Sequence, residues 1–194
     1  IGSEAMLGFA VTGLSKRVKP CPSLPKTEEV LLVLTKPIGI GIILAAEMRG
    51  ICSSDSYDAA LAAMLESNAR AADIIISSAP SALMTDVTGF GLARHGLNLA
   101  QRAEATGIEL WLDSLPLLAG AKELASSGMR SSLFSHNRQD IAVKGGAMLG
   151  TEYSSVMELL FDPQTSGGIL AALQQSKAYE ICSKLHKAGY IEAE

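Results

Sequence analysis

The chain has 194 residues, of which 48% are hydrophobic and 19% are charged, and its formal net charge at pH 7 is −4. This length and apolar content suffice for one ordinary hydrophobic core, and no apolar run is long enough to span a membrane. The slight acidity and the lack of a basic patch in the sequence argue against nucleic acid or a membrane surface as a partner.

The first 26 residues are predicted to be the end of one domain followed by a linker, and residues 27–194 to be a second domain. Ala5 to Leu14 is apolar and rich in β-branched and small residues, which is typical of a strand. Three prolines between Lys16 and Lys26 exclude a helix there and indicate an extended linker. The chain begins without an initiator methionine or a signal peptide, so we expect a piece of a longer protein.

The cysteines and the next elements give no cofactor signature. Cys21, Cys52 and Cys182 form no CxxC pair, so free thiols in a reducing cytoplasm are predicted. Glu29 to Thr35 is a buried strand by pattern. It is followed by a glycine-rich turn, Lys36 to Gly41, that opens a helix to about Met48. This turn is neither a Walker loop nor a dinucleotide-binding fingerprint, which favours a structural turn.

A long amphipathic pattern predicts one continuous helix from Ser54 to about Ile76. Ser54 is a favourable N-cap, and acidic residues suit the first turn of the helix. Its larger apolar residues approximate a single stripe, as expected for a helix that packs on a core. After a break, the apolar run from Ser81 to Met84 predicts a short strand.

The next turn, Thr85 to Gly91, is the strongest candidate site. Gly89 and Gly91 permit positive φ and the close approach of a ligand, and the following helix, from Leu92, favours an anion at its N-terminus. Asp86 would repel a bare phosphate but not one that arrives with Mg²⁺, which proteins often hold with one carboxylate and substrate phosphates. The alternative is that Asp86 or a threonine of the turn only caps the helix.

The region between this turn and residue 152 is patterned more weakly. The helix from Leu92 to about Ala105 contains His95, which we interpret as a satisfied structural residue and not as a catalyst. Gly107 to Asp113 alternates apolar and polar residues and predicts a strand with one buried face. Pro116 to Ser126 predicts a helix that ends at Gly128.

Met129 to Asn137 is predicted to be polar and irregular, and a glycine-rich surface loop with a short helix at one end follows. A local basic cluster is predicted here, made of Arg130, His136, Asn137 and Arg138. They form either a cluster that meets phosphates held by a partner domain or a solvated loop.

A second polar glycine turn, Asp162 to Gly168, precedes a predicted strand from Ile169 to Leu173. Its candidate cleft residues are Asp162, Thr165, Ser166, Gly167 and Gly168. Because the ends of neighbouring strands converge on clefts, we expect this turn to lie within reach of the Asp86 turn. Asp162 before a proline could equally be a simple turn former. A helix from Ser176 to Ala188, ended by Gly189, and a short final strand complete the chain.

This order of elements predicts an α/β fold of the α+β type, with a mixed sheet that carries helices on its faces. Four segments also resemble the selenophosphate synthetase (selenide, water dikinase) family in the expected order. They are Leu34 to Gly41, Thr85 to Leu92 (TDVTGFGL), Gly128 to Leu133, and Leu160 to Leu170 (LFDPQTSGGIL). The resemblance covers nearly the whole chain, but only the C-terminal half of the family.

The resemblance implies a three-layer sandwich, partly ferredoxin-like, as in aminoimidazole ribonucleotide synthetase and its superfamily. It implies that the full-length protein makes selenophosphate, AMP and phosphate from selenide, ATP and water, and that it forms a homodimer mainly through the missing N-terminal domain. Asp86 matches the one Mg²⁺ carboxylate of the C-terminal half. Thr85, Thr88, Gly89 and Gly91 would then lie near the nucleotide phosphates.

The resemblance places no catalytic residue in this chain, so the piece alone is expected to be inactive. Three positions depart from the family pattern: Ile40, where many members have a hydroxyl residue, Arg94 and Gly96. These departures leave two alternatives open, a non-catalytic scaffold or dimerisation domain and another synthetase or kinase of the superfamily.

Overall fold

The structure is a computed structural model that describes residues 10, 12–14, 24, 29–143 and 154–194. The strand predicted from Ala5 to Leu14 and the linker that follows it therefore lie almost entirely outside the described residues. Within the part of the chain that the structure describes, no helix is both long and apolar enough to cross a membrane.

The centre of the fold is a three-stranded sheet in the order β1 (Val30–Leu34), β3 (Ile169–Gln174) and β2 (Leu83–Asp86). Both pairings are antiparallel, with Leu34 opposite Leu170 and Asp86 opposite Ile169. The α+β class is confirmed. The prediction of a mixed sheet is wrong for the described strands, because the two outer strands both run opposite to the central one.

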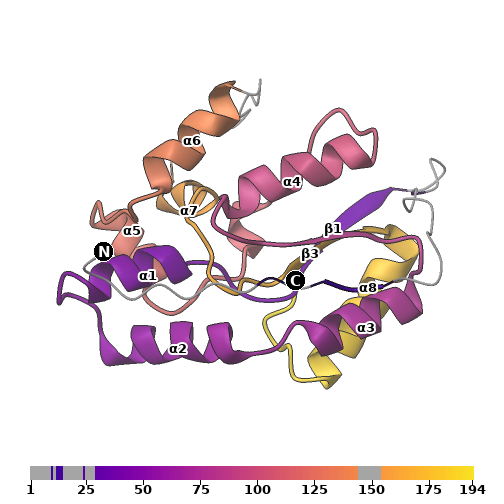
Figure 1. The fold of residues 1–194 in the computed structure, drawn as a ribbon, viewed down its shortest axis with the longest axis horizontal. Helices are drawn as coiled ribbons and strands as arrows, with labels where there is room; N and C mark the ends of the chain where they lie inside the picture. The colour runs from indigo at the N-terminus through magenta and orange to yellow at the C-terminus, as the bar shows by residue number, and fades with distance from the viewer. Residues whose placement is uncertain (1–9, 11, 15–23, 25–28, 144–153) are drawn as a thin grey trace.

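Helices cover both faces of this sheet and create two hydrophobic cores (Figure 1). The alternation of side chains along β3 divides them: Leu170 and Ala172 face one core, and Ala171 and Leu173 face the other. The second core is closed by α3 (Ala69–Ser78) and α8 (Gln175–Lys187). The first is closed by α1 (Ile40–Glu47), α2 (Ser54–Leu65), α4 (Gly91–Arg102), α5 (Ala121–Ser126), α6 (Phe134–Val143) and α7 (Ser155–Leu159). The structure therefore has the three layers that the resemblance implies.

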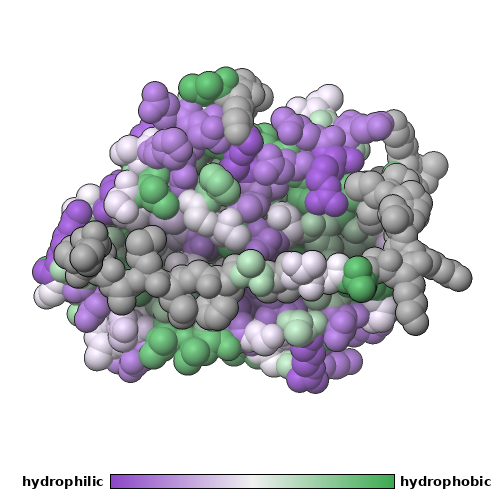
Figure 2. All heavy atoms as spheres, viewed as in Figure 1, coloured by the Kyte–Doolittle hydropathy of each residue, from purple (hydrophilic) through white to green (hydrophobic). Residues whose placement is uncertain are grey.

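The surface is mixed in polarity, and hydrophobic side chains form several separate groups in the view of Figure 2, one of them over α2. Leu61 and Leu65 of α2 are exposed there. The formal net charge of the chain is −4.

The continuous helix predicted from Ser54 to Ile76 is wrong: the chain breaks between α2 and α3, where Glu66 has the extended ψ of 124°. The break has a tertiary cause, because the ammonium of Lys36 binds the carbonyl oxygens of Ala63 and Glu66 at 3.0 and 2.6 Å. The N-cap is also one residue earlier than predicted. The hydroxyl of Ser53, not that of Ser54, accepts the hydrogen bond that caps α2.

No strand forms from Gly107 to Asp113, although the predicted alternation of burial is present. Leu110 and Leu112 pack on the first core, and Ile108 lies over α4, where a Cβ on Gly96 would come within 2.5 Å of its Cδ1. No strand among the described residues pairs with this segment, which ends in a 3₁₀ helix, Leu112–Ser114. A larger side chain at position 96 would therefore collide with Ile108.

Three other boundaries differ from their predictions. The helix predicted from Pro116 begins only at Ala121, because the preceding residues pair with Ile38 through hydrogen bonds to Pro116 O and from Leu118 N. The irregular stretch predicted up to Asn137 already contains the start of α6, whose buried residues follow helical spacing. The final strand is absent, but Glu194 exchanges two backbone hydrogen bonds with Leu34 of β1.

Candidate functional site

The turn between β2 and α4 leaves the Asp86 side chain exposed at the surface. The helix begins at Gly91, its N-cap is Phe90, and no side chain caps it. The interpretation of Asp86 or a threonine as the cap of this helix is therefore wrong. Among the described residues, no hydrogen bond or ion pair reaches the Asp86 carboxylate, and Thr85 turns its hydroxyl to the Asp86 carbonyl at 3.2 Å.

Thr88 is fixed by hydrogen bonds on both sides of its backbone. Its N–H donates to Nε2 of the buried His95 at 3.1 Å, and its carbonyl accepts from the N–H groups of Gly91 and Gln164 at 3.0 and 3.1 Å. Burial lowers the pKa of His95, while the Asp86 carboxylate acts in the opposite direction. Since Nε2 must accept a hydrogen bond, the neutral imidazole is the form that fits this turn.

This contact predicts a pH dependence of stability. Because the pKa of folded His95 lies below its ordinary value of 6.5, the unfolded chain takes up the proton first as the pH falls. The contribution of His95 should be complete above about pH 6.5 and should decrease below it. We expect wild type to lose more stability between pH 7 and pH 5 than His95→Gln, which retains an acceptor but does not titrate, in urea unfolding at both pH values. Equal losses of stability in the two proteins would contradict this role.

Gly89 is held by α6, an interaction that the sequence did not indicate. Its carbonyl accepts from Nδ2 of the buried Asn137 at 2.8 Å, and the same nitrogen donates to Phe161 O at 3.0 Å. The C=O and the following N–H of a trans peptide point in opposite directions, so the Phe90 N–H points away from Asn137. Within the described residues, the N–H groups of Gly89 and Phe90 have no acceptor.

The two glycines of this turn differ in what the fold requires of them. Gly91 has φ of +78°, and a Cβ there would lie 2.8 Å from Leu160 O, so only glycine fits. Gly89 has no positive φ, and the nearest atom to a Cβ there is Leu133 Cδ1 at 4.0 Å. Nothing in the packing of the described chain therefore requires glycine at position 89, and its backbone is open to a ligand.

The Asp162 to Gly168 turn lies directly beside the Asp86 turn, as predicted. Asp86 pairs with Ile169 across the sheet, and the Val87 N–H donates to Gly168 O at 2.8 Å. A Cβ on Gly167 would meet Val87 O at 2.3 Å, which shows how closely the two turns approach. Thr165 and Ser166 are exposed at this edge of the sheet.

Asp162 itself is buried and does not line an open cleft. Its Oδ2 accepts from the Ile42 N–H at 3.0 Å, while Gln164 Oε1 accepts from the N–H groups of Gly39 and Ile40 at 3.1 and 3.2 Å. Burial raises the pKa of Asp162 to about 6, against the effect of these hydrogen bonds. The two side chains therefore cap α1, and its glycine-rich start has the structural role that its sequence favours.

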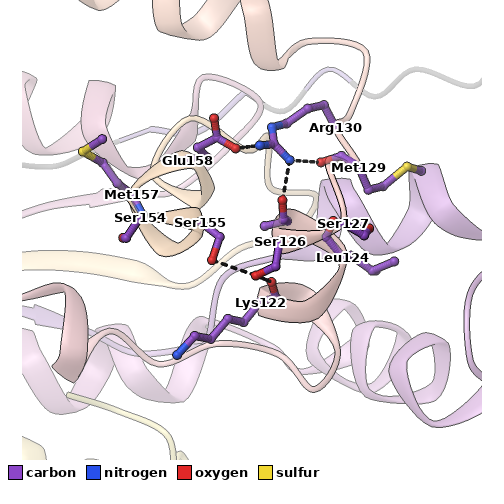
Figure 3. Close-up of polar contacts among 11 residues, drawn as sticks. Lys122, Leu124, Ser126, Ser127, Met129, Arg130, Ser154, Ser155, Met157 and Glu158 are labelled. Carbon is purple, nitrogen blue, oxygen red and sulfur yellow. Dashed lines mark hydrogen bonds and ion pairs between the residues drawn. The ribbon is translucent and has the colours of Figure 1, made fainter. Parts of the chain in front are cut away.

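The basic residues near α6 do not form one phosphate-binding cluster. Arg130 forms an ion pair with the buried Glu158 (Figure 3) and donates to Ala125 O at 2.8 Å. Its guanidinium also lies over the ring of Phe134. Burial lowers the pKa of Arg130, and the charge of Arg138 adds to that effect. Arg130 thus joins the end of α5 to α7.

Lys36 is a further buried polar residue, and the sequence pattern did not indicate its role. Its ammonium donates to Ala63 O, Glu66 O and Ser166 O at 3.0, 2.6 and 3.0 Å. Its position in the sequence, directly after a buried strand and before Pro37, was the one sign that its side chain could be buried.

The donor set suits Mg²⁺ shared with a ligand better than a metal held by this chain alone. No group of three or more His, Cys, Asp or Glu side chains able to hold a metal occurs among the described residues. Asp86 is one free carboxylate beside unpaired N–H groups, and Mg²⁺ is commonly bound by one or two carboxylates together with phosphates. The site therefore fits a magnesium–phosphate ligand.

Comparisons with known proteins identify the family of this chain. The family described as AIR synthase related protein, C-terminal domain, matches residues 27–194. The protein named "Selenide, water dikinase" from Caldanaerobacter subterraneus subsp. tengcongensis is 36% identical over 95% of this chain and 52% of its own length. The protein of that name from Carboxydothermus hydrogenoformans is 34% identical over 99% of this chain and 55% of its own length.

The chain thus spans about half the length of the curated relatives it matches. A crystal structure of hydrogenase maturation protein HypE covers 86% of this chain and 42% of its own chain, with 12% identity and a TM-score of 0.48. The match over residues 27–194 shows that this chain belongs to the AIR synthase related protein family as its C-terminal domain.

Proposed function

We propose that this chain is the C-terminal half of a selenide, water dikinase and forms one side of its magnesium–ATP cleft. The full-length enzyme would convert selenide, ATP and water to selenophosphate, AMP and phosphate. The observation that carries the proposal is the free Asp86 carboxylate beside the open backbone of Gly89. The names of the relatives support the same reaction.

In this proposal Asp86 holds Mg²⁺ that also binds the phosphates of ATP, and the cation neutralises charge that would otherwise oppose phosphoryl transfer. The carbonyl oxygens of Thr88 and Gly89 already accept hydrogen bonds from the protein, so they do not face the ligand. Thr85 and Gly91 shape the ends of that turn. The catalytic groups would belong to the N-terminal half of the protein, which we also propose to form the dimer in the cytoplasm.

Two departures from the family pattern prove to be packing changes, which weakens the scaffold alternative. Ile108 occupies the space above Gly96, and Arg94 pairs with Asp140 at 3.4 Å on neighbouring helices α4 and α6. The third, Ile40, is fully buried at the start of α1. A calorimetric titration of the full-length protein with ATP, with and without Mg²⁺, separates the two functions. If this half is only a scaffold or dimerisation domain, replacing Asp86 should not alter the effect of Mg²⁺ on the affinity for ATP.

The isolated 194-residue chain should fold but should not turn over ATP. Both cores are closed by helices of this chain, whereas no glycine-rich loop with a catalytic lysine is present among its motifs. The measurement is selenide-dependent AMP release by the purified chain, with a cooperative thermal transition as evidence of folding. Robust AMP release by this chain alone would refute the assignment of the catalytic groups to the other half.

A further inference from the structure

We propose that the turn formed by Ser166, Gly167 and Gly168 is a separate oxyanion site, in which two backbone N–H groups bind a phosphate group and Lys36 supplies the positive charge. This site lies next to the Asp86 turn but does not depend on magnesium or on the identity of the enzyme. A test of this site therefore does not depend on whether the function proposed above is correct.

The first step is the orientation of two successive peptide groups. The Ser166 carbonyl accepts from Lys36 Nζ at 3.0 Å, and the Gly167 carbonyl accepts from Asn68 Nδ2 at 2.8 Å. Both donors act at the junction of α2 and α3, since Lys36 also binds the end of α2. No peptide bond among the described residues is cis. The N–H groups of Gly167 and Gly168 consequently point away from this junction.

The second step is that these two N–H groups are unpaired. Neither has an acceptor among the described residues, whereas the next one, of Ile169, donates to Thr35 Oγ1 at 2.8 Å. Gly167 and Gly168 are buried, and a buried N–H without a partner is unfavourable, so an acceptor from a ligand would stabilise the turn. Ser166 has a left-handed φ of 51°, and successive N–H groups in such a turn form a concave site for anions.

The third step is the charge behind the turn. Lys36 is 1% exposed, and its three hydrogen bonds to carbonyl oxygens match the three donors of an ammonium group. No ion pair neutralises it among the described residues. The ammonium polarises the peptide that joins Ser166 to Gly167, which makes the Gly167 N–H a stronger donor toward an anion.

The ligand class follows from the surroundings. The exposed hydroxyls of Thr165 and Ser166 flank the turn and can donate to further oxygens. A tetrahedral oxyanion with several acceptors suits this arrangement, and the nearby Asp86 opposes it unless other charges compensate. Either a phosphate of a bound nucleotide or free phosphate has this chemistry.

The test is a phosphate titration of the full-length protein, selectively labelled with ¹⁵N-glycine and followed by NMR without nucleotide or magnesium. We expect saturable shifts of the Gly167 and Gly168 amide signals, and none for Gly50 or Gly128, which have open surroundings. Absence of such shifts up to tens of millimolar phosphate, both without and with Mg²⁺, overturns the proposal. A stronger shift with ATP than with phosphate assigns the nucleotide as the source of the oxyanion.

Variants separate this site from the magnesium site. Lys36→Met should weaken phosphate binding at least tenfold, while Lys177→Met, at an exposed lysine of α8, should leave it unchanged. Because Lys36 also holds the end of α2, Asn68→Asp is the second variant, and its added negative charge should also weaken binding. Asp86→Asn should keep the phosphate shifts even if it abolishes turnover. Shifts that survive in both Lys36→Met and Asn68→Asp overturn the role of this turn, whatever the outcome at Asp86.

Discussion

Replacing Asp86 by asparagine should lower the magnesium-dependent turnover of the full-length enzyme by orders of magnitude and leave its stability almost unchanged. The carboxylate is exposed and has no partner among the described residues, and surface substitutions of this kind usually change stability by less than about 0.5 kcal/mol. A lost metal ligand acts on the barrier directly, since each factor of ten in rate is about 1.4 kcal/mol.

The measurements are the melting temperature and AMP release as a function of magnesium concentration. If Asp86 binds Mg²⁺, the half-saturating magnesium concentration of Asp86→Asn should rise as turnover falls. Asp73→Asn is the control, because it removes the same charge from an exposed position on α3. This helix lies on the face of the sheet opposite to α4, the helix that follows the Asp86 turn, so the variant should behave like wild type. Near-normal turnover of Asp86→Asn at ordinary magnesium would refute the metal assignment.

The sequence predicts best those elements whose pattern is local. The strand from Val30 to Leu34, the strand from Ile169, and the helices after Gly91 and Ser176 all have a clear apolar period or a glycine stop. The approach of the Asp86 and Asp162 turns was also predictable, because each turn ends or begins a short apolar strand.

Elements decided by distant residues could not be predicted in this way. The break after Leu65 depends on Lys36, which is almost thirty residues earlier and binds the end of α2 through Ala63 O and Glu66 O. The alternation from Gly107 to Asp113 correctly predicts which side chains are buried. A strand also needs a neighbouring strand to pair with, and none lies beside this segment in the described part of the chain. Helix α6 has a weak apolar pattern because Asn137 occupies one of its buried positions.

The same limit applies to the site. Sequence patterns single out Asp86 and Gly89, whose chemistry is visible in the motif, but not the side chains that hold them. His95 and Asn137 reach the turn from two different helices, and each binds one backbone group of Thr88 or Gly89. A histidine or asparagine within a helix carries no local sign of such a contact, so its role becomes visible only in three dimensions.

Gly89→Ala should give a protein that is at least as stable as wild type but impaired with ATP. Alanine restricts the unfolded chain, which stabilises a protein by about 0.4–1 kcal/mol where the native backbone tolerates it. Gly89 meets this condition, with no positive φ and 4.0 Å to the nearest atom. If phosphate oxygens approach its backbone, the added methyl group should raise the KM for ATP about tenfold or more.

Gly91→Ala is the matched control in the same turn. Its φ of +78° and the Leu160 oxygen 2.8 Å from the new Cβ predict a loss of about 1–2 kcal/mol of stability. Thermal unfolding and the KM for magnesium–ATP, measured on both variants of the full-length enzyme, therefore separate a glycine needed by the fold from one needed by a ligand. If Gly89→Ala is stable and binds ATP normally, the ligand does not approach this backbone.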